Sequence, residues 1–184
     1  FALHQVPSGI LSPGKHCPIA YGCVVEPDGL LAEIDGLRSR GVEVGANLTI
    51  SARAHVVLPR HIDEDRQRGE ALGTTGRGIG PCYADKAHRD RAVRAGDLFE
   101  PGLGEHFGTW AEALEPFVTE EEWPEDRRVL FEGAHAVLLD VDHGTYPFVT
   151  SSSCTGLGLP AGRRTGVAKA YLSRVGEGPF PTEI

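Results

Sequence analysis

The sequence EGAHAVLLDVDHGTYPFVTSS, residues 132–152, is the stretch from which the fold of this chain is predicted. It follows Val129-Leu130-Phe131, an apolar run that predicts a buried strand ending at Glu132-Gly133. Open α/β sheets bind ligands in the loops beyond the carboxyl ends of their strands. A polar loop directly after an apolar strand therefore predicts an α/β fold with a functional site in this stretch.

The stretch concentrates ionisable and hydroxyl side chains, namely His135, Asp140, Asp142, His143, Thr145, Thr150, Ser151 and Ser152. Histidines that flank two acids could perform acid–base catalysis. Alternatively, one histidine caps a turn while the carboxylates accept hydrogen bonds from loop amides. A metal site at residues 140–143 is a further alternative, and the hydroxyls of residues 150–152 either bind phosphate or form a turn after a strand.

The remaining pattern alternates strands with helices, which favours the α/β class. Strands are predicted at residues 19–25, 48–51 and 54–58, helices at 28–41, 59–70, 81–94 and 163–172, a helical surface hairpin at 104–126, and loops at 7–15 and 175–183. A chain of 184 residues is long enough for one domain and short for two, so residues 1–184 are expected to form a single domain.

The composition excludes several classes of partner. The net charge of −8 argues against general affinity for nucleic acid or anionic membrane. Neither a spanning segment of about 20 apolar residues nor a signal pattern is present, which predicts a cytoplasmic protein. The four cysteines lack CxxC spacing and are expected to be free, buried thiols, and a zinc site at residues 16–23 is disfavoured. The absence of methionine suggests that the chain is a piece of a larger protein.

A second landmark is GTTGRGIGP, residues 73–81. Glycines let backbone N–H groups approach a ligand, hydroxyls donate to phosphate oxygens, and a following helix N-terminus favours an anion. The spacing matches neither a Walker loop nor a dinucleotide-binding fingerprint. The loop is therefore interpreted either as an anion-binding loop or as a flexible surface loop.

A basic cluster follows this loop at Lys86, Arg89, Arg91 and Arg94. In the predicted helix Lys86 and Arg89 would share a face, which suggests an anion site. The alternative is a solvated face paired with the acids at positions 85, 90 and 97.

Four strings together resemble one family, adenylosuccinate synthetase. They are HQVPSGIL from His4, GTTGRGIGPCYADK from Gly73, FEGAHAVLLDVDHGTYPFVTSSS from Phe131 and KAYLSRVGEGPFPTE from Lys169. The resemblance covers most of residues 3–100 and 128–184. It implies a partial central-sheet nucleotide-binding α/β fold with flanking helices, in which residues 101–127 form a divergent, shortened helical insert.

The resemblance also implies an activity. Members of the family ligate IMP and L-aspartate to adenylosuccinate in AMP biosynthesis, using GTP and Mg²⁺, through a 6-phosphoryl-IMP intermediate. The phosphoryl group turns the 6-oxygen of IMP into a good leaving group. The family works as a homodimer.

Five positions are assigned by the same resemblance. Thr74 and Thr75 resemble the loop that binds the IMP phosphate, and Thr150 resembles a threonine contacting that phosphate. Arg89 resembles the arginine that reaches the IMP of the neighbouring subunit. His135 stands where the family has glutamine; because histidine presents different hydrogen-bonding groups and can gain charge, IMP binding is expected to weaken or become pH-dependent.

The family's catalytic base and acid, most of its GTP site and its aspartate loop are expected to lie outside these 184 residues. The chain is therefore expected to retain part of the IMP site, with no catalytic residue and no metal ligand of its own. One alternative is a non-catalytic purine-nucleotide or phosphate-binding fragment. Another is a phosphate-binding loop protein with an unrelated substrate.

Overall fold

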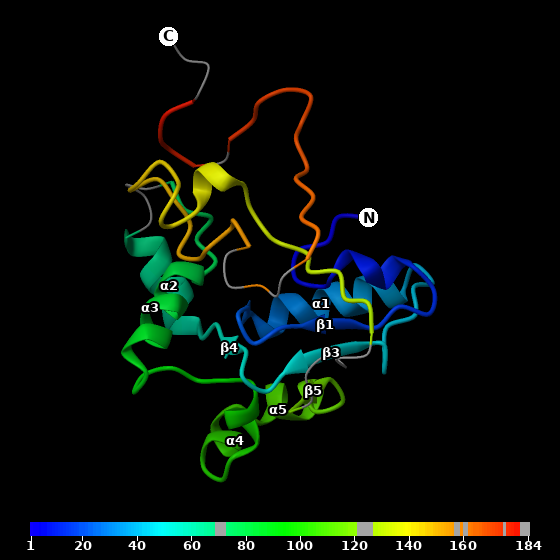
Figure 1. The fold of residues 1–184 in the computed structure, drawn as a ribbon. Helices are drawn as coiled ribbons and strands as arrows, with labels where there is room; N and C mark the ends of the chain where they lie inside the picture. Colours follow the sequence, from blue (N-terminus) through cyan, green and yellow to red (C-terminus); the bar gives the residue numbers. More distant parts are fainter. Residues whose placement is uncertain (69–72, 121–126, 157–158, 160–161, 175, 181–184) are drawn as a thin grey trace. The chain divides into compact units, whose positions relative to one another are not determined.

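The computed structural model describes residues 1–68, 73–120, 127–156, 159, 162–174 and 176–180 (Figure 1). These residues divide into two compact units. Unit 1 comprises residues 1–59 and 82–132, and unit 2 comprises residues 60–81 and 133–184. Each unit is built from two separate stretches of the chain and is described by itself.

Unit 1 contains the sheets. β1 (Cys17–Ile19), β3 (Leu48–Ser51) and β5 (Val118–Thr119) form one sheet in the order β1-β3-β5, and β2 (Val24–Val25) pairs with β4 (His55–Val56). All of these pairings are parallel, with Cys17 opposite Leu48 and Ile50 opposite Val118. Parallel neighbours need long crossover connections, so the arrangement confirms the predicted α/β class. The expected strand at 19–25 is in fact two short strands separated by a turn.

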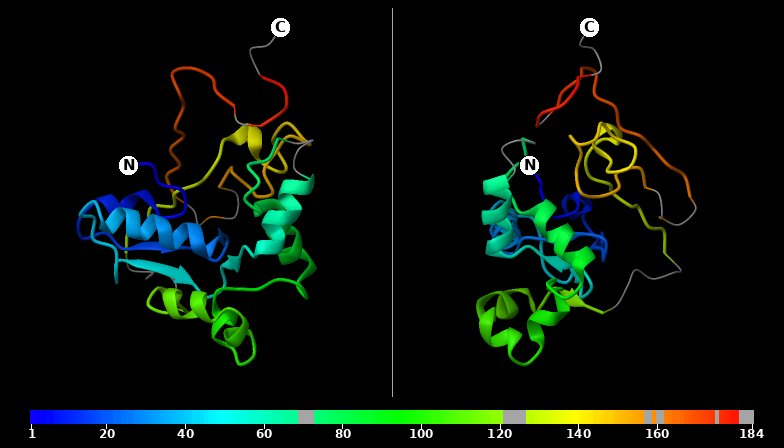
Figure 2. Two further views of the ribbon diagram at one scale, coloured as in Figure 1. Left: turned by 180° about the vertical axis from the view of Figure 1, so that it is seen from behind. Right: turned by 90° about the vertical axis from the view of Figure 1, so that its left-hand side faces the viewer.

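The first crossover helix, α1 (Pro27–Arg38), forms where its sequence predicts it. Proline suits the first helical position, and the Glu26 carboxylate accepts the N–H groups of Asp28 and Gly29 at 3.1 and 2.7 Å. Figures 1 and 2 show α1 running beside the sheet. Its buried residues share one core with the sheet and with the segment around α5 (Gly108–Leu114), and the main contributors are Leu30, Ile34, Leu37, Leu48, Ile50, Leu114 and Phe117.

The predicted helix at 81–94 is wrong in its extent. The observed helix α3 (Ile79–His88) ends at His88, because Arg89 adopts a left-handed backbone conformation with φ of +73°. Lys86 and Arg89 therefore do not share a helix face. Arg91 instead lies 3.8 Å from the carboxylate of Asp85, and Arg94 pairs with Asp97 at 3.1 Å, as the alternative of acid-paired arginines predicts.

The segment after α3 forms several short helices. η3 (Gly96–Phe99), α4 (Leu103–His106) and α5 are short helices, and the chain then enters β5. The expectation of a helical hairpin at 104–126 holds for its first part only, and residues 121–126 lie outside the described residues. Leu114 and Phe117 are buried, so this segment helps to close the core of unit 1.

Unit 2 consists largely of loops. α2 (Pro59–Arg68) starts in the last residue of unit 1, and the first turn of α3 and the short helix η4 (Val137–Leu139) also belong to unit 2. Two of the predicted elements are absent: residues 129–131, which belong to unit 1, form no strand, and residues 163–172, in unit 2, form no helix. Leu130 is 92% exposed and Val167 is 97% exposed. Apolar segments become regular elements only where a neighbouring element buries them, and neither segment is buried.

All four cysteines are free; Cys17 and Cys82 are buried as expected, whereas Cys23 is exposed. The loop at 7–15 contains the short helix η1 (Ser8–Leu11). Across the described ranges, none of the helices has the length and apolar character needed to cross a membrane.

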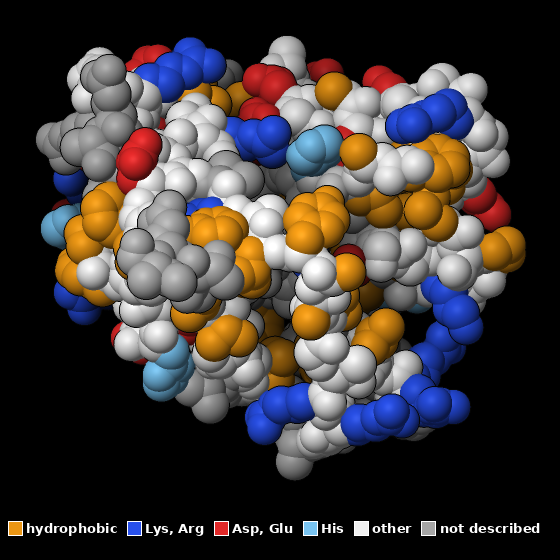
Figure 3. Space-filling model, turned by 90° about the horizontal axis from the view of Figure 1, so that it is seen from above, with side chains coloured by type: hydrophobic (Ala, Val, Ile, Leu, Met, Phe, Trp, Pro, Cys, Tyr) orange, Lys and Arg blue, Asp and Glu red, His pale blue; other side chains and the backbone are white. Residues whose placement is uncertain are grey.

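Hydrophobic side chains are exposed on the surface, as Figure 3 shows for one face. The exposed hydrophobic residues of unit 2 include Val137, Tyr146, Val167, Tyr171 and Leu172.

Candidate functional site in unit 2

The glycine-rich loop connects α2 to α3. Gly73, Gly76 and Gly78 all have positive φ angles, between +64° and +77°. This conformation is accessible to glycine without strain, and it lets the loop turn sharply into the first turn of α3. Thr75 is exposed on the loop, so its hydroxyl can reach a ligand.

Asp65 on α2 anchors both ends of this loop. Its Oδ1 accepts a hydrogen bond from Thr74 Oγ1 at 2.9 Å, and its Oδ2 accepts the backbone N–H of Gly78 at 2.9 Å. Asp65 lies within the helix that the sequence predicts at 59–70, and it is only 7% exposed. His61, one helical turn earlier, is buried as well. Their four-residue spacing on one helix face was the available signal.

Asp140 organises the stretch from which the sequence analysis starts. It is fully buried, and Oδ1 accepts the backbone N–H groups of Asp142 and His143 at 3.0 Å. Oδ2 accepts the backbone N–H groups of Cys154 and Thr155 and the hydroxyl of Ser153.

These donors hold the pKa of Asp140 far below its usual range, and the N–H of Cys154 is the largest cause. Such a carboxylate stays ionised at neutral pH and has its acceptor positions occupied. Asp140 therefore acts as an acceptor for loop amides, which is the second of the alternatives given above, and is unsuited to proton transfer.

The hydroxyl-rich segment around Thr150 packs against the start of α3. The backbone N–H of Thr150 donates to the carbonyl of Leu139 at 2.8 Å, which fixes the segment beside η4. A Cβ added at Gly80 would lie 3.3 Å from Ser151 Oγ. The structure thus brings the segment after Thr150 next to the end of the glycine-rich loop, at the N-terminus of a ten-residue helix, where backbone N–H groups favour anions.

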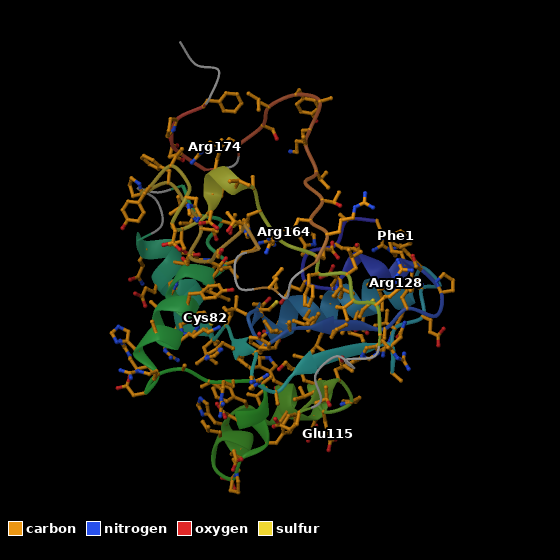
Figure 4. The ribbon with its side chains drawn as sticks, viewed as in Figure 1. Phe1, Cys82, Glu115, Arg128, Arg164 and Arg174 are labelled. Atoms are coloured by element: carbon orange, nitrogen blue, oxygen red, sulfur yellow. The ribbon has the colours of Figure 1, made fainter. Side chains whose placement is uncertain are left out.

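Arg174 ties further loops of unit 2 together. Figure 4 labels its side chain beside η4, where Nη2 donates to the carbonyl of Phe148 at 2.7 Å and Nη1 to Thr145 Oγ1 at 3.2 Å. Its Nε donates to the carbonyl of Glu177 at 2.8 Å. Because a Cβ at Gly73 would lie 2.8 Å from the backbone nitrogen of Glu177 and 3.1 Å from Cα of Gly176, these two residues also contact the start of the glycine-rich loop.

His135 and Arg89 have an unusual backbone conformation. Among the non-glycine residues that the structure describes, these two have positive φ angles, +67° and +73°. His135 is exposed in the segment leading to η4, and Arg89 is exposed in unit 1, directly after α3. Non-glycine residues rarely adopt this conformation, and such strained positions cluster at functional sites.

No metal cage is found among the residues described. Their His, Cys, Asp and Glu side chains form no group of three that could hold an ion. Nε2 of His16, which was considered as a zinc ligand, lies 3.1 Å from the hydroxyl of Thr49. Mg²⁺ is usually held by one or two carboxylates together with the phosphates of a bound nucleotide, rather than by a cage of protein ligands alone.

The parallel sheets of unit 1, together with the glycine- and hydroxyl-rich loops of unit 2, define an α/β protein of the nucleotide-binding class. The sequence model of the adenylosuccinate synthetase family matches residues 1–120 and 105–184. The chain belongs to the adenylosuccinate synthetase family.

The relatives agree with this assignment. An adenylosuccinate synthetase of Synechococcus sp. (strain JA-2-3B'a(2-13)) is 44% identical across all of this chain, which covers 52% of that relative. One of Moorella thermoacetica is also 44% identical, with 54% of its length covered. The chain thus spans about half the length of the curated relatives it matches. The alignments run over 234 residues against 184 here, so these relatives carry additional residues within the matched region.

Two solved structures are similar to this one. A fully ligated adenylosuccinate synthetase from Plasmodium falciparum superimposes with a TM-score of 0.80 at 31% identity, covering all of this chain and 54% of that one. The succinoaminodeoxyadenylate synthetase of cyanophage S-2L, bound to dGMP and dATP, gives a TM-score of 0.59 at 25% identity. It covers 84% of this chain and 43% of the phage protein. The likeness confirms a partial α/β nucleotide-binding fold.

Proposed function

We propose that this chain forms part of an enzyme that ligates IMP and L-aspartate to adenylosuccinate at the expense of GTP. The observation that carries the proposal is the match of the family along both parts of the chain, residues 1–120 and 105–184. The arrangement of unit 2 supports it, since the glycine-rich loop ends beside the hydroxyl-rich segment at a helix N-terminus. That arrangement suits a ligand carrying a phosphate group.

The reaction proceeds in two steps. The 6-oxygen of IMP attacks the γ-phosphorus of GTP, the bond to the leaving GDP breaks, and the N1 proton of IMP passes to a base outside these residues, which gives 6-phosphoryl-IMP. The amine of L-aspartate then attacks carbon 6, the carbon–oxygen bond breaks, phosphate leaves with the bonding electrons, and the new amine loses a proton. Mg²⁺ bound to the GTP phosphates would neutralise charge on the transferred group.

In this proposal the chain supplies part of the IMP site. Residues of the glycine-rich loop, with Thr74 and Thr75, and the segment of Thr150 bind the IMP phosphate through hydroxyl and backbone N–H donors. His135 lies beside the bound nucleotide at the position of the family's glutamine. Arg89 reaches the IMP of the neighbouring subunit in a homodimer, which functions in the cytoplasm.

Calorimetry with the purified 184-residue chain tests the binding part. IMP is expected to bind, and Thr150→Val is expected to weaken binding about tenfold, because a hydroxyl that donates to phosphate is lost. Thr165→Val is the matched control, since Thr165 is exposed in a separate loop segment of unit 2. The absence of IMP binding by the wild-type chain would contradict the proposal.

A coupled assay separates the ligase from a binding fragment. The complete protein should form adenylosuccinate only when IMP, GTP and L-aspartate are all present. If IMP binds but the complete protein forms no adenylosuccinate, the alternative of a non-catalytic purine-nucleotide-binding protein is correct.

A further inference from the structure

The buried acid behind the glycine-rich loop has no role in the chemistry described so far. We propose that Asp65 is a positioning residue, which holds residues 74–78 in the conformation that receives the substrate phosphate. Thr74 is its partner in this role, and Thr75 offers the hydroxyl that faces the phosphate. The inference rests on the proposed function, because it names what prepares the phosphate loop of that same site.

The geometry of the carboxylate supports this role. Its two oxygens bind the two ends of the loop, Thr74 Oγ1 and Gly78 N, each at 2.9 Å. Asp65 belongs to a helix, so its own position is set by α2 rather than by the loop. A carboxylate that holds both ends fixes the path of the glycines between them, which would otherwise sample many conformations.

The hydroxyls of Thr74 and Thr75 have different hydrogen-bonding roles. A hydroxyl has one proton to donate, and the proton of Thr74 is directed at Asp65. A phosphate oxygen needs donors, so while this bond persists Thr74 can serve the phosphate through its backbone N–H but not through its hydroxyl. Thr75 is exposed and adjacent, and its proton is the one available to a phosphate.

The negative charge of Asp65 makes it possible to predict the direction in which its replacement changes IMP affinity. A negative carboxylate near an anion site disfavours anion binding, so removing only the charge would strengthen phosphate binding. Asp65→Asn removes the charge but also replaces one of the two acceptor oxygens by an NH₂ group, so the side chain can no longer accept from both Thr74 Oγ1 and Gly78 N. If Asp65 positions the loop, this substitution must weaken binding in spite of the lost repulsion.

Calorimetry with IMP on the full chain makes this comparison. Asp65→Asn is expected to weaken IMP binding about tenfold, the effect of losing one hydrogen bond that involves a charged group. Asp63→Asn is the matched control, because it makes the same charge change at an exposed position of the same helix and should stay within about twofold of the wild type. Binding by Asp65→Asn that equals or exceeds that of the wild type would overturn the inference.

A second pair of variants avoids the buried site. Thr74 is exposed, so Thr74→Val and Thr74→Ser are expected to fold. Thr74→Val should weaken IMP binding about tenfold, and Thr74→Ser should restore it, because serine keeps the hydroxyl that donates to Asp65. In a double-mutant cycle the effects of Asp65→Ala and Thr74→Val should be strongly non-additive, and full additivity would overturn the partnership.

Hydrogen exchange at the Gly78 amide reports on the loop without any ligand. Asp65→Ala, which removes both acceptor oxygens, should speed this exchange by about tenfold, whereas Asp63→Ala should not change it. An unchanged Gly78 amide in Asp65→Ala overturns the inference even if IMP binds normally to the wild type. If the wild-type chain binds no IMP, the proposed function fails, and the exchange rate still decides whether Asp65 holds the loop.

Discussion

Cys154 donates its backbone N–H to Oδ2 of Asp140, fourteen residues earlier in the chain. Together with the other four donors described above, this contact closes the 140–155 region on a single carboxylate. Unit 2 has little regular secondary structure, and side-chain anchors such as Asp140, Asp65 and Arg174 take the place of a sheet.

Asp140→Asn should loosen the 140–155 region. Asparagine has one acceptor oxygen, so it cannot receive donors on both sides as the carboxylate does. We expect the amides of Cys154 and Thr155, or those of Asp142 and His143, to exchange with solvent at least about tenfold faster. Asp142→Asn is the control, because Asp142 is exposed and its own side chain anchors nothing in the structure described. Unchanged exchange in Asp140→Asn would contradict this account.

The same anchor predicts a pH dependence. The pKa of Asp140 is lowered in the folded chain, so its contribution to stability is complete above the unfolded pKa of about 4 and is lost only as the pH falls through the lower folded value. Protection of the Cys154 and Thr155 amides should therefore be constant from neutral pH down to about 4 and should decline below it. The Asp140→Asn variant should lack this acid-dependent step; a step at neutral pH would argue against the assignment.

Gly144→Ala should destabilise unit 2 on steric grounds. A Cβ at this position would lie 2.5 Å from the carbonyl oxygens of Asp140 and Leu138, which are backbone atoms that cannot move aside freely. A loss of roughly 2–3 kcal/mol in the free energy of unfolding is expected in denaturant titrations. Gly133→Ala provides the control, since no atom lies within 4 Å of its added Cβ. Equal stability of the two variants would rule out the steric argument.

Arg174→Lys should also destabilise unit 2. Lysine retains the charge, but its single ammonium group cannot bind the Phe148 carbonyl, the Thr145 hydroxyl and the Glu177 carbonyl together. The expected loss is about 1–2 kcal/mol in the free energy of unfolding. Arg164→Lys, at an exposed arginine that Figure 4 also labels, should change stability by less than about 0.5 kcal/mol.

His135→Gly tests the strained backbone at this position. Replacing histidine by glycine removes the cost of a positive φ, about 1 kcal/mol, and this offsets the entropy that glycine adds to the unfolded chain. His143 is exposed but is not among the residues with positive φ, so His143→Gly should be less stable than His135→Gly by about 1 kcal/mol. Thermal unfolding of the two variants measures the difference, and the opposite order would contradict the prediction.

Local patterns predicted the elements that depend on local interactions. Proline at position 27 and apolar residues at helical spacing correctly predicted helix α1, and the apolar run at 48–51 correctly predicted strand β3. The runs at 129–131 and 163–172 are equally suggestive as sequence, yet Leu130 and Val167 are exposed and neither run forms a regular element. Whether such a run becomes a strand or a helix depends on a distant partner, which sequence spacing does not reveal.

The candidate functional site shows the same division between features that local sequence predicts and features that depend on distant contacts. Its two landmark stretches, residues 73–81 and 132–152, could be located from composition and motif order, and the family membership they indicated is confirmed. The end of α3 could not be predicted, because arginine at position 89 gives no sign that it will take a left-handed conformation. The roles of Thr74, Thr75, Arg89, His135 and Thr150 in binding IMP stay predictions.

By itself, the sequence determined the α/β class, the family and the two loops where a substrate phosphate is expected, because these follow from residue types in a fixed order. Only the tertiary structure decided what the acids do. Asp65 binds an amide thirteen residues away, and Asp140 binds one fifteen residues away. A carboxylate has the same covalent chemistry in every context, and the donors that surround it after folding decide whether it catalyses, binds a metal or holds a loop in place.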